Sequence, residues 1–274
     1  MRLGLIEIGL CGAIALAGCA TMEVPQRVAL AEHVAAEHRF SRADIQTEHF
    51  RLAAFIGPQK KAGVLHVYIE GDGFAWVTRY KPSRDPTPRE PVALDLAVLD
   101  HRNAAYLARP CQYVMASEAE CPVRYWTSDR FAPEVIDSMN EAVSQLKGKT
   151  GADRLVLIGY SGGGAVAALV AARRTDVIQF VTVAGNLDHR TWTRLHKTSD
   201  LTGSLNPPDS WRTLAGIPQM HFIGKDDHAV PAEVYRAYRK AFPESADIHA
   251  EILPNVDHRC CWADVWPTLL MQLR

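Results

Sequence analysis

Residues 154–174 constrain the fold of this chain more than any other stretch. Residues 154–158 form a short aliphatic run typical of a strand buried inside a parallel sheet. Gly159-Tyr160-Ser161-Gly162-Gly163 follows at once, and 164–174 is rich in helix formers and ends in two arginines. A turn too tight for side chains at 159 and 163 raises the serine above the carboxyl end of the sheet. Ser161 is therefore a candidate nucleophile, and a glycine-rich turn without chemistry is the alternative.

A serine hydroxyl needs a base to take its proton and a carboxylate to orient that base. On a strand, turn and helix of this kind, the acid and then the histidine follow, each in a loop after a later strand. Residues 217–224 predict one such strand and 225–231 its loop, whose final proline opens a helix. Loops of this type usually read Gly-x-x-Asp-x-x-Val-Pro, which favours Asp227 as the acid, with Asp226 as the alternative.

Position along the chain selects the histidine. Eleven histidines are present, so one somewhere after the acid is weak evidence by itself. Residues 246–253 alternate as a last strand, and the loop after them ends at His258, before a terminal helix that starts at Trp262. By contrast, His228 lies beside the acid and His249 lies within the strand. We therefore expect His258 to be the base.

Attack on a carbonyl also requires backbone N–H groups that stabilise the oxygen anion. The Gly162 N–H is one expected donor, because it follows the serine at the start of a helix. The second is expected in the loop after the strand at 63–69, which reads Glu70-Gly71-Asp72-Gly73-Phe74. Small residues let the backbone approach a substrate, which favours the Asp72 N–H, with the Gly73 N–H as the alternative. A turn without function is another interpretation, and a metal site on Glu70 and Asp72 lacks a third ligand at suitable spacing.

Together, these segments resemble the α/β-hydrolase superfamily: a strand before EGDG, a strand before GYSGG and a helix, a strand before GKDDxxVP, and a late histidine loop. YIEGDGFAW from Tyr68, RPCQY from Arg109 and YWTS from Tyr125 also resemble a group of bacterial α/β-hydrolase lipoproteins. The resemblance covers residues 45–274 and implies ester or thioester hydrolysis, in a superfamily that includes peptidases, acyltransferases and non-catalytic members. Glu70 departs from the pattern, because many esterases carry a histidine before the oxyanion glycine.

The N-terminus predicts export and a lipid anchor. An apolar run at 3–16 follows Arg2, which is the layout of a secretory signal. Leu16-Ala17-Gly18-Cys19 resembles the bacterial lipobox, which implies removal of residues 1–18, diacylation of Cys19 and location at the cell envelope, on the periplasmic face of the outer membrane. Glu7 departs from a signal core, and its charge and the short run also disfavour a plain transmembrane anchor.

Four cysteines remain after the signal and the lipid site: Cys111, Cys121, Cys260 and Cys261. In an oxidising compartment they suggest disulfides. We expect a Cys111–Cys121 bridge that closes a short polar loop. Cys260 and Cys261 either form a bridge between neighbours or remain thiols packed as small apolar groups. Zinc is disfavoured, because no histidine pair has metal-ligand spacing near these cysteines.

Length and element order predict one α/β domain. Alternating strands and helices indicate a doubly wound, mostly parallel sheet with helices on both faces. Residues 19–44 are expected to be a lipidated N-terminus and helical arm, and 45–274 the hydrolase domain. Residues 185–211 are a candidate cap over the site, with an ordinary surface crossover as the alternative. A net charge of −1 gives no support to nucleic-acid binding.

Within this domain, local patterns predict four further elements. We expect a first strand at 45–56, a helix at 91–107, a central strand at 111–115 and a helix at 131–146.

The function most consistent with the sequence is hydrolysis of a small-molecule carboxylic ester by a Ser161-Asp227-His258 triad. The N–H groups of Gly162 and Asp72 would hold the oxyanion, and this chemistry needs neither a metal nor an organic cofactor. A catalytically silent envelope lipoprotein that uses the same scaffold for binding is the alternative, as is a peptidase or acyltransferase of the same fold.

Overall fold

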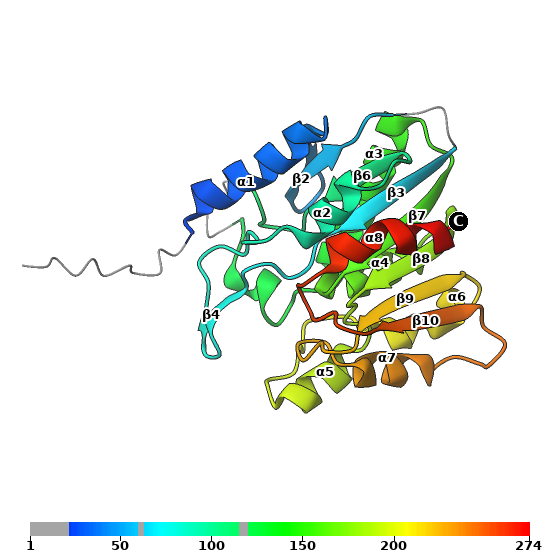
Figure 1. Cartoon of the computed structure of the whole chain (residues 1–274). Helices are drawn as coiled ribbons and strands as arrows, with labels where there is room; N and C mark the ends of the chain where they lie inside the picture. The colour runs from blue at the N-terminus through cyan, green and yellow to red at the C-terminus, as the bar shows by residue number, and fades with distance from the viewer. Residues whose placement is uncertain (1–21, 60–62, 115–119) are drawn as a thin grey trace, which may run out of the picture.

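The computed structural model describes residues 22–59, 63–114 and 120–274. An eight-stranded sheet runs through the molecule in the order β1-β2-β6-β3-β7-β8-β9-β10 (Figure 1). From β6 to β10 neighbouring strands are parallel, whereas β2 is antiparallel to both β1 and β6. The strands of this sheet are β1 (Ser41–Gln46), β2 (Arg51–Ile56), β3 (Val64–Ile69), β6 (Ala104–Leu107), β7 (Arg154–Tyr160), β8 (Val177–Val183), β9 (Gln219–Gly224) and β10 (Ile248–Leu253). The predicted mostly parallel sheet is confirmed.

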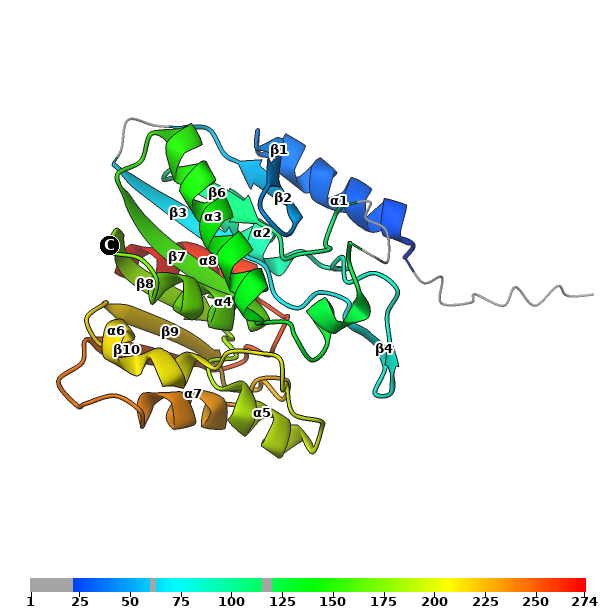
Figure 2. The same ribbon diagram turned by 180° about the vertical axis from the view of Figure 1, so that it is seen from behind.

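Helices cover both faces of the sheet, as Figure 1 and its reverse view in Figure 2 show. One face packs against α3 (Pro133–Thr150), α4 (Gly162–Ala171), α6 (Trp211–Leu214) and α7 (Ala232–Arg239). The other packs against α1 (Val24–Glu37), α2 (Val92–Val98) and α8 (Trp262–Leu269). Single turns of 3-10 helix lie at Val123–Trp126, Pro207–Ser210 and Leu270–Gln272. Because helices cover both faces of the sheet, six of the seven residues of β7 are buried.

Side chains alternate between the two cores along each central strand. In β3, Leu65 and Val67 join the core beneath α3 and α4, whereas Tyr68 joins the core beneath α2 and α8. Burial of each such large apolar side chain contributes about 1.5–3 kcal/mol. The sheet is thereby held rigid, and the loops at the carboxyl ends of its strands have a fixed platform.

The strand expected at 45–56 is a hairpin instead. β1 ends at Gln46, and β2 begins at Arg51. In the turn between them, the Thr47 N–H and hydroxyl both donate to the Phe50 carbonyl, at 2.9 and 2.7 Å. The alternation of side chains continues across this turn, so the sequence pattern did not reveal it.

The helix expected at 91–107 is a helix followed by a strand. α2 ends at Val98. The Asp100 carboxylate just after it accepts a hydrogen bond from the Tyr68 hydroxyl and contacts His66 Nδ1. Ala104–Leu107 then forms β6 between β2 and β3, although alanine and leucine favour a helix. Backbone pairing on both sides outweighs that local preference. The strand expected at 111–115 is also wrong, because 111–114 are turns and bends, while Met115 lies outside the described residues.

The remaining expected elements agree more closely with the structure. α1 forms the helical arm, and the helix expected at 131–146 runs from Pro133 to Thr150, ending at Gly151 with a φ of 68°. The signal segment 1–18 and Cys19 lie outside the described residues. Among the residues that the structure describes, no helix combines the length and apolar character needed to cross a bilayer.

Candidate active site

Ser161 lies in the tight turn between β7 and α4. Its φ of 51° and ψ of −122° are rarely adopted by a residue with a side chain and cost on the order of 1–3 kcal/mol. A Cβ at Gly159 would lie 2.2 Å from the Gly163 carbonyl oxygen, and one at Gly163 would lie 2.3 Å from the Ile69 carbonyl oxygen. The crowding explains both glycines. The turn therefore presents Ser161 at the carboxyl end of the sheet, as the sequence predicts.

His258 reaches Ser161 from the loop after β10. Its Nε2 lies 3.0 Å from Ser161 Oγ, and its Nδ1 lies 2.8 Å from Asp227 Oδ2. The Tyr160 hydroxyl and the Trp262 indole N–H donate to the His258 carbonyl oxygen, at 2.8 and 3.2 Å, and hold this loop in place. The structure thus brings the three residues selected from the sequence into one chain of hydrogen bonds.

Asp227 and Asp226 differ completely in environment. The Asp227 side chain is fully buried, and its Oδ1 accepts the N–H groups of Ala229 and Val230 at 2.8 and 2.7 Å. These bonds leave Oδ2 directed at His258. Asp226 is exposed. The geometry therefore places Asp227, and not its neighbour, beside the histidine.

The Asp72 side chain forms a charged cluster that the sequence did not suggest. Its two oxygens pair with Arg109 Nη1 at 3.3 Å and Arg130 Nη1 at 2.5 Å, and both arginines are 4% exposed. Burial alone would raise the pKa of the Asp72 carboxyl, but the two guanidinium groups outweigh burial and lower it. A Cβ at Gly162 would lie 2.1 Å from Asp72 Oδ1, so this carboxylate lies against the residue after Ser161.

The Glu70 side chain is buried, and both of its carboxylate oxygens accept hydrogen bonds from nearby groups. Its Oε1 accepts the Gly71 N–H at 2.8 Å, and its Oε2 accepts the Tyr106 hydroxyl at 3.1 Å. Burial raises the pKa of Glu70 to about 7. Because Glu70 occupies the Gly71 N–H, the two N–H groups proposed from the sequence, those of Asp72 and Gly73, remain the candidates for an oxyanion donor. In the described parts of the chain, no three metal-binding side chains come together.

A cavity of about 320 Å³ opens beside Ser161. Trp192, from α5 (His189–His196), lies in its wall and donates its indole N–H to the Ala229 carbonyl at 2.7 Å. The segment 185–211 thus contributes to the cavity and contacts the loop that holds Asp227. Phe74 and Trp76, from the YIEGDGFAW segment, also line the cavity, as do Arg89, Arg130 and Asn186, which the sequence did not single out. Arg89, Arg130 and Asn186 belong to no local motif, and only folding brings them to the serine.

Two disulfides are present in the described chain. Cys111 is joined to Cys121, with their Cα atoms 5.7 Å apart, which confirms the expected bridge. Cys260 is joined to Cys261, the arrangement that the sequence left open. Beside the first bridge, the Gln112 amide donates to the Gly71 carbonyl at 3.0 Å. The Cys111 region therefore supports the loop at 70–74.

Comparison with known proteins provides evidence on the fold of this chain. No protein-family model and no curated protein sequence matches this chain. Among solved structures, Est1E from Butyrivibrio proteoclasticus is similar, with a TM-score of 0.58 and 13% identity over 84% of this chain and 98% of its own. The α/β hydrolase GrgF from Penicillium sp. sh18 has a TM-score of 0.60 and 17% identity over 85% and 96%. An α/β serine hydrolase homologue from Coxiella burnetii has a TM-score of 0.57 and 15% identity over 85% and 97%.

These identities are low, so the likeness concerns architecture. Together with the sheet order and the turn at Ser161, it shows that the chain has the α/β-hydrolase fold.

Proposed function

We propose that this protein is a serine hydrolase that cleaves carboxylic esters. The observation that carries the proposal is the hydrogen-bonded chain from Ser161 through His258 to Asp227, which lies at a cavity. One similar structure is named as a serine hydrolase homologue, which supports the same chemistry. Function on this fold depends on the site, and the arrangement of Ser161, His258 and Asp227 supports acyl transfer.

Each residue has a defined part in the proposed reaction. Ser161 Oγ attacks the acyl carbon while His258 Nε2 takes the hydroxyl proton, and Asp227 stabilises the imidazolium through its Nδ1–H. The tetrahedral intermediate collapses as the ester C–O bond breaks and His258 protonates the leaving alcohol. Water then attacks the acyl-serine, His258 takes its proton, and the carboxylic acid leaves as the Ser161 hydroxyl is restored.

The oxyanion of each tetrahedral intermediate is assigned to two backbone donors. The Gly162 N–H opens α4, where the helix dipole is positive, and the Asp72 N–H is the second donor. Such a donor typically contributes about 10²–10³ in rate. Because Arg109 and Arg130 neutralise the Asp72 carboxylate, its charge does not oppose the developing anion.

A fluorophosphonate probe tests the proposal. The wild type should be labelled, and Ser161→Ala should lose labelling and about 10⁶-fold of its esterase rate. A folded wild type that resists the probe and hydrolyses none of a panel of chromogenic esters of increasing chain length would instead favour a silent binding lipoprotein. The panel also defines the acyl-chain preference.

We also propose that Cys19 carries a lipid anchor at the cell envelope. The LAGC sequence at 16–19 supports this assignment. Metabolic labelling with a fatty-acid analogue should mark the wild type, and Cys19→Ser should remove the mark. Label retained in that variant would rule out this residue as the anchor site.

A further inference from the structure

The β4–β5 hairpin carries exposed apolar side chains beside the cavity. β4 (Trp76–Thr78) and β5 (Lys81–Pro82) pair as a separate two-stranded sheet. Trp76, Val77 and Tyr80 are 39%, 50% and 85% exposed. Elsewhere in the described chain, exposed large apolar residues occur singly, so this cluster within five positions is unusual.

Positive charge accompanies these apolar side chains. Residues 73–84 contain Arg79, Lys81 and Arg84 and no aspartate or glutamate, in a chain whose net charge is −1. All three basic residues are exposed. The Arg79 guanidinium donates to the Lys197 carbonyl at 3.0 Å, which joins the hairpin to the end of α5 and adds another exposed lysine. The result is a surface that is both aromatic and basic.

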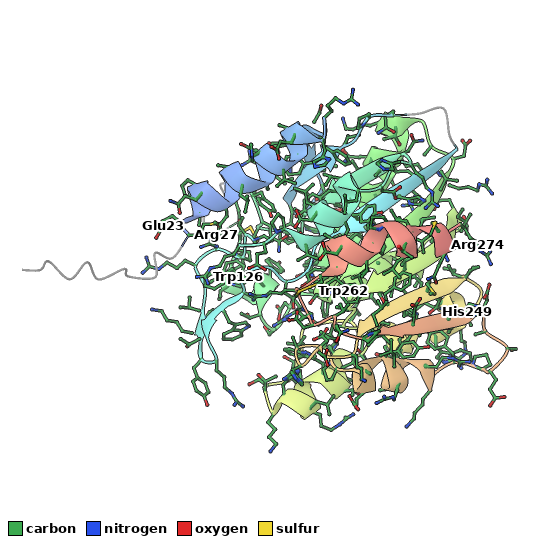
Figure 3. All side chains as sticks on the ribbon, in the orientation of Figure 1. Glu23, Arg27, Trp126, His249, Trp262 and Arg274 are labelled. Carbon is green, nitrogen blue, oxygen red and sulfur yellow. A yellow bond between two sulfur atoms is a disulfide. The ribbon has the colours of Figure 1, made fainter. Side chains whose placement is uncertain are left out.

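The hairpin lies at the cavity and near the start of the described chain. Trp76 lines the cavity together with Ser161. At the beginning of α1, Arg27 donates to the Thr87 carbonyl at 3.0 Å and stacks on Phe74, just beyond the two ends of the hairpin. Figure 3 shows Arg27 near the hairpin, and side chains of the hairpin project away from the rest of the domain.

We propose that residues 76–84 dock onto a membrane surface rich in anionic lipid, with the cavity opening beside the bilayer. Tryptophan and tyrosine are suited to the headgroup region, because their rings are apolar at one end and polar at the other. Each basic residue near an anionic leaflet strengthens binding by about fivefold. Three apolar side chains are too few for a stable protein interface, which buries about 800 Å² on each partner.

The proposed lipid anchor is consistent with this orientation. Three peptide steps separate Cys19 from Met22, which is at most about 11 Å of chain. Met22 in turn lies beside Arg27, because the Arg27 Nε donates to the Met22 carbonyl oxygen at 2.9 Å. The acyl chains proposed on Cys19 would therefore enter the bilayer on the hairpin side.

Vesicle sedimentation tests the proposal without using hydrolysis. Residues 22–274 contain every helix and strand described above, and they lack the signal segment and the anchor cysteine. This protein should sediment with vesicles of phosphatidylcholine and phosphatidylglycerol and much less with phosphatidylcholine alone. Added salt should release it, because salt screens exposed charges.

Two pairs of substitutions separate charge from apolar insertion. Lys81→Glu/Arg84→Glu should weaken binding to the anionic vesicles by more than about tenfold. Val77→Ser/Tyr80→Ser should weaken it by about tenfold, through loss of insertion. The matched controls are Lys149→Glu/Arg154→Glu, where both basic residues are exposed near the opposite end of β7, and Met271→Ser, where the side chain is 76% exposed. The controls should bind like the wild type.

Equal sedimentation with both lipid mixtures, or hairpin variants that sediment like the controls, would overturn the docking proposal. Far-UV circular dichroism and the unfolding midpoint establish that each variant is folded. Vesicle sedimentation does not require hydrolytic activity. Failure of the docking proposal is therefore distinct from failure of the proposed hydrolase function.

Discussion

Two loops bring carboxylates to the vicinity of Ser161, and the two carboxylates have different kinds of partner. The Asp227 side chain is fully buried, whereas that of Asp72 is 20% exposed. After β9, Asp227 accepts two backbone N–H groups and faces one imidazole. After β3, Asp72 is held by two guanidinium groups. An imidazole can gain a proton during a reaction, so the charge of Asp227 is available to stabilise it. Two permanent cations already neutralise Asp72. Proximity to Ser161 therefore does not distinguish the two carboxylates, whereas their partners do.

The two loops also differ in how they are supported. The Asp227 loop is closed by local bonds to residues two and three positions further along. The Asp72 loop depends on Arg109, Gln112 and Arg130, which belong to another part of the chain. We therefore expect substitutions in the first loop to change the reaction rate and those in the second to change mainly stability.

The largest expected effect is on rate, at Asp227. Asp227→Asn should lower kcat/KM on a chromogenic ester by about 10⁴, because the imidazole loses the carboxylate that orients it and stabilises its charged form. Asp226→Asn is the matched control and should keep a substantial fraction of activity with the same fold. Reversed effects would assign the acid to Asp226.

The next effect is on stability, at Asp72. Asp72→Asn should lower the free energy of unfolding by about 3–5 kcal/mol, because two buried guanidinium groups lose their counter-charge. The backbone N–H proposed for the oxyanion remains, so the rate per folded molecule should fall far less than in Asp227→Asn. Denaturant unfolding and ester hydrolysis measure the two quantities. Unchanged stability together with a 10⁴-fold slower reaction would remove the distinction between the loops.

A smaller effect concerns Glu70 and pH. Its pKa of about 7 in the folded protein lies above the ordinary value of 4.5, so the folded state holds this proton more tightly. Its contribution to stability is therefore complete below pH 4.5 and is lost as pH rises to about 7. Over that interval the loss amounts to about 3 kcal/mol.

Glu70→Gln isolates this contribution from other groups, such as Asp95, whose pKa burial raises to about 6. Unfolding free energies at pH 4.5 and 7.5 should decline less in the variant than in the wild type. Parallel declines in the two proteins would show that Glu70 titrates normally when folded.

The smallest expected effect belongs to the bridge that supports the Asp72 loop. Cys111→Ser/Cys121→Ser should lower the free energy of unfolding by about 2–3 kcal/mol, as expected for a closed loop of about ten residues. Non-reducing peptide mapping should join the peptides of Cys111 and Cys121. A peptide of Cys111 linked to Cys260 or Cys261 would contradict the pairing.

Local patterns in the sequence were sufficient for the elements that surround the proposed triad. The turn at Ser161, the strand and loop that lead to Asp227, and the loop that ends at His258 each depend on residues adjacent in the chain. Their steric and propensity rules act over a few positions, so they can be identified without knowledge of the fold.

The tertiary structure decided what depends on distant partners. Ala104–Leu107 is a strand because β2 and β3 supply hydrogen bonds on both sides, although its residues favour a helix. Arg109 and Arg130 lie 37 and 58 positions from Asp72, and no sequence pattern links either of them to it, so only the folded chain assigns them to that carboxylate. The sequence by itself therefore determined the candidate nucleophile, acid and base, because local geometry specifies them. The charge that surrounds them was decided by long-range packing, because the energy of a buried carboxylate depends on which groups the fold places within a few ångströms of it.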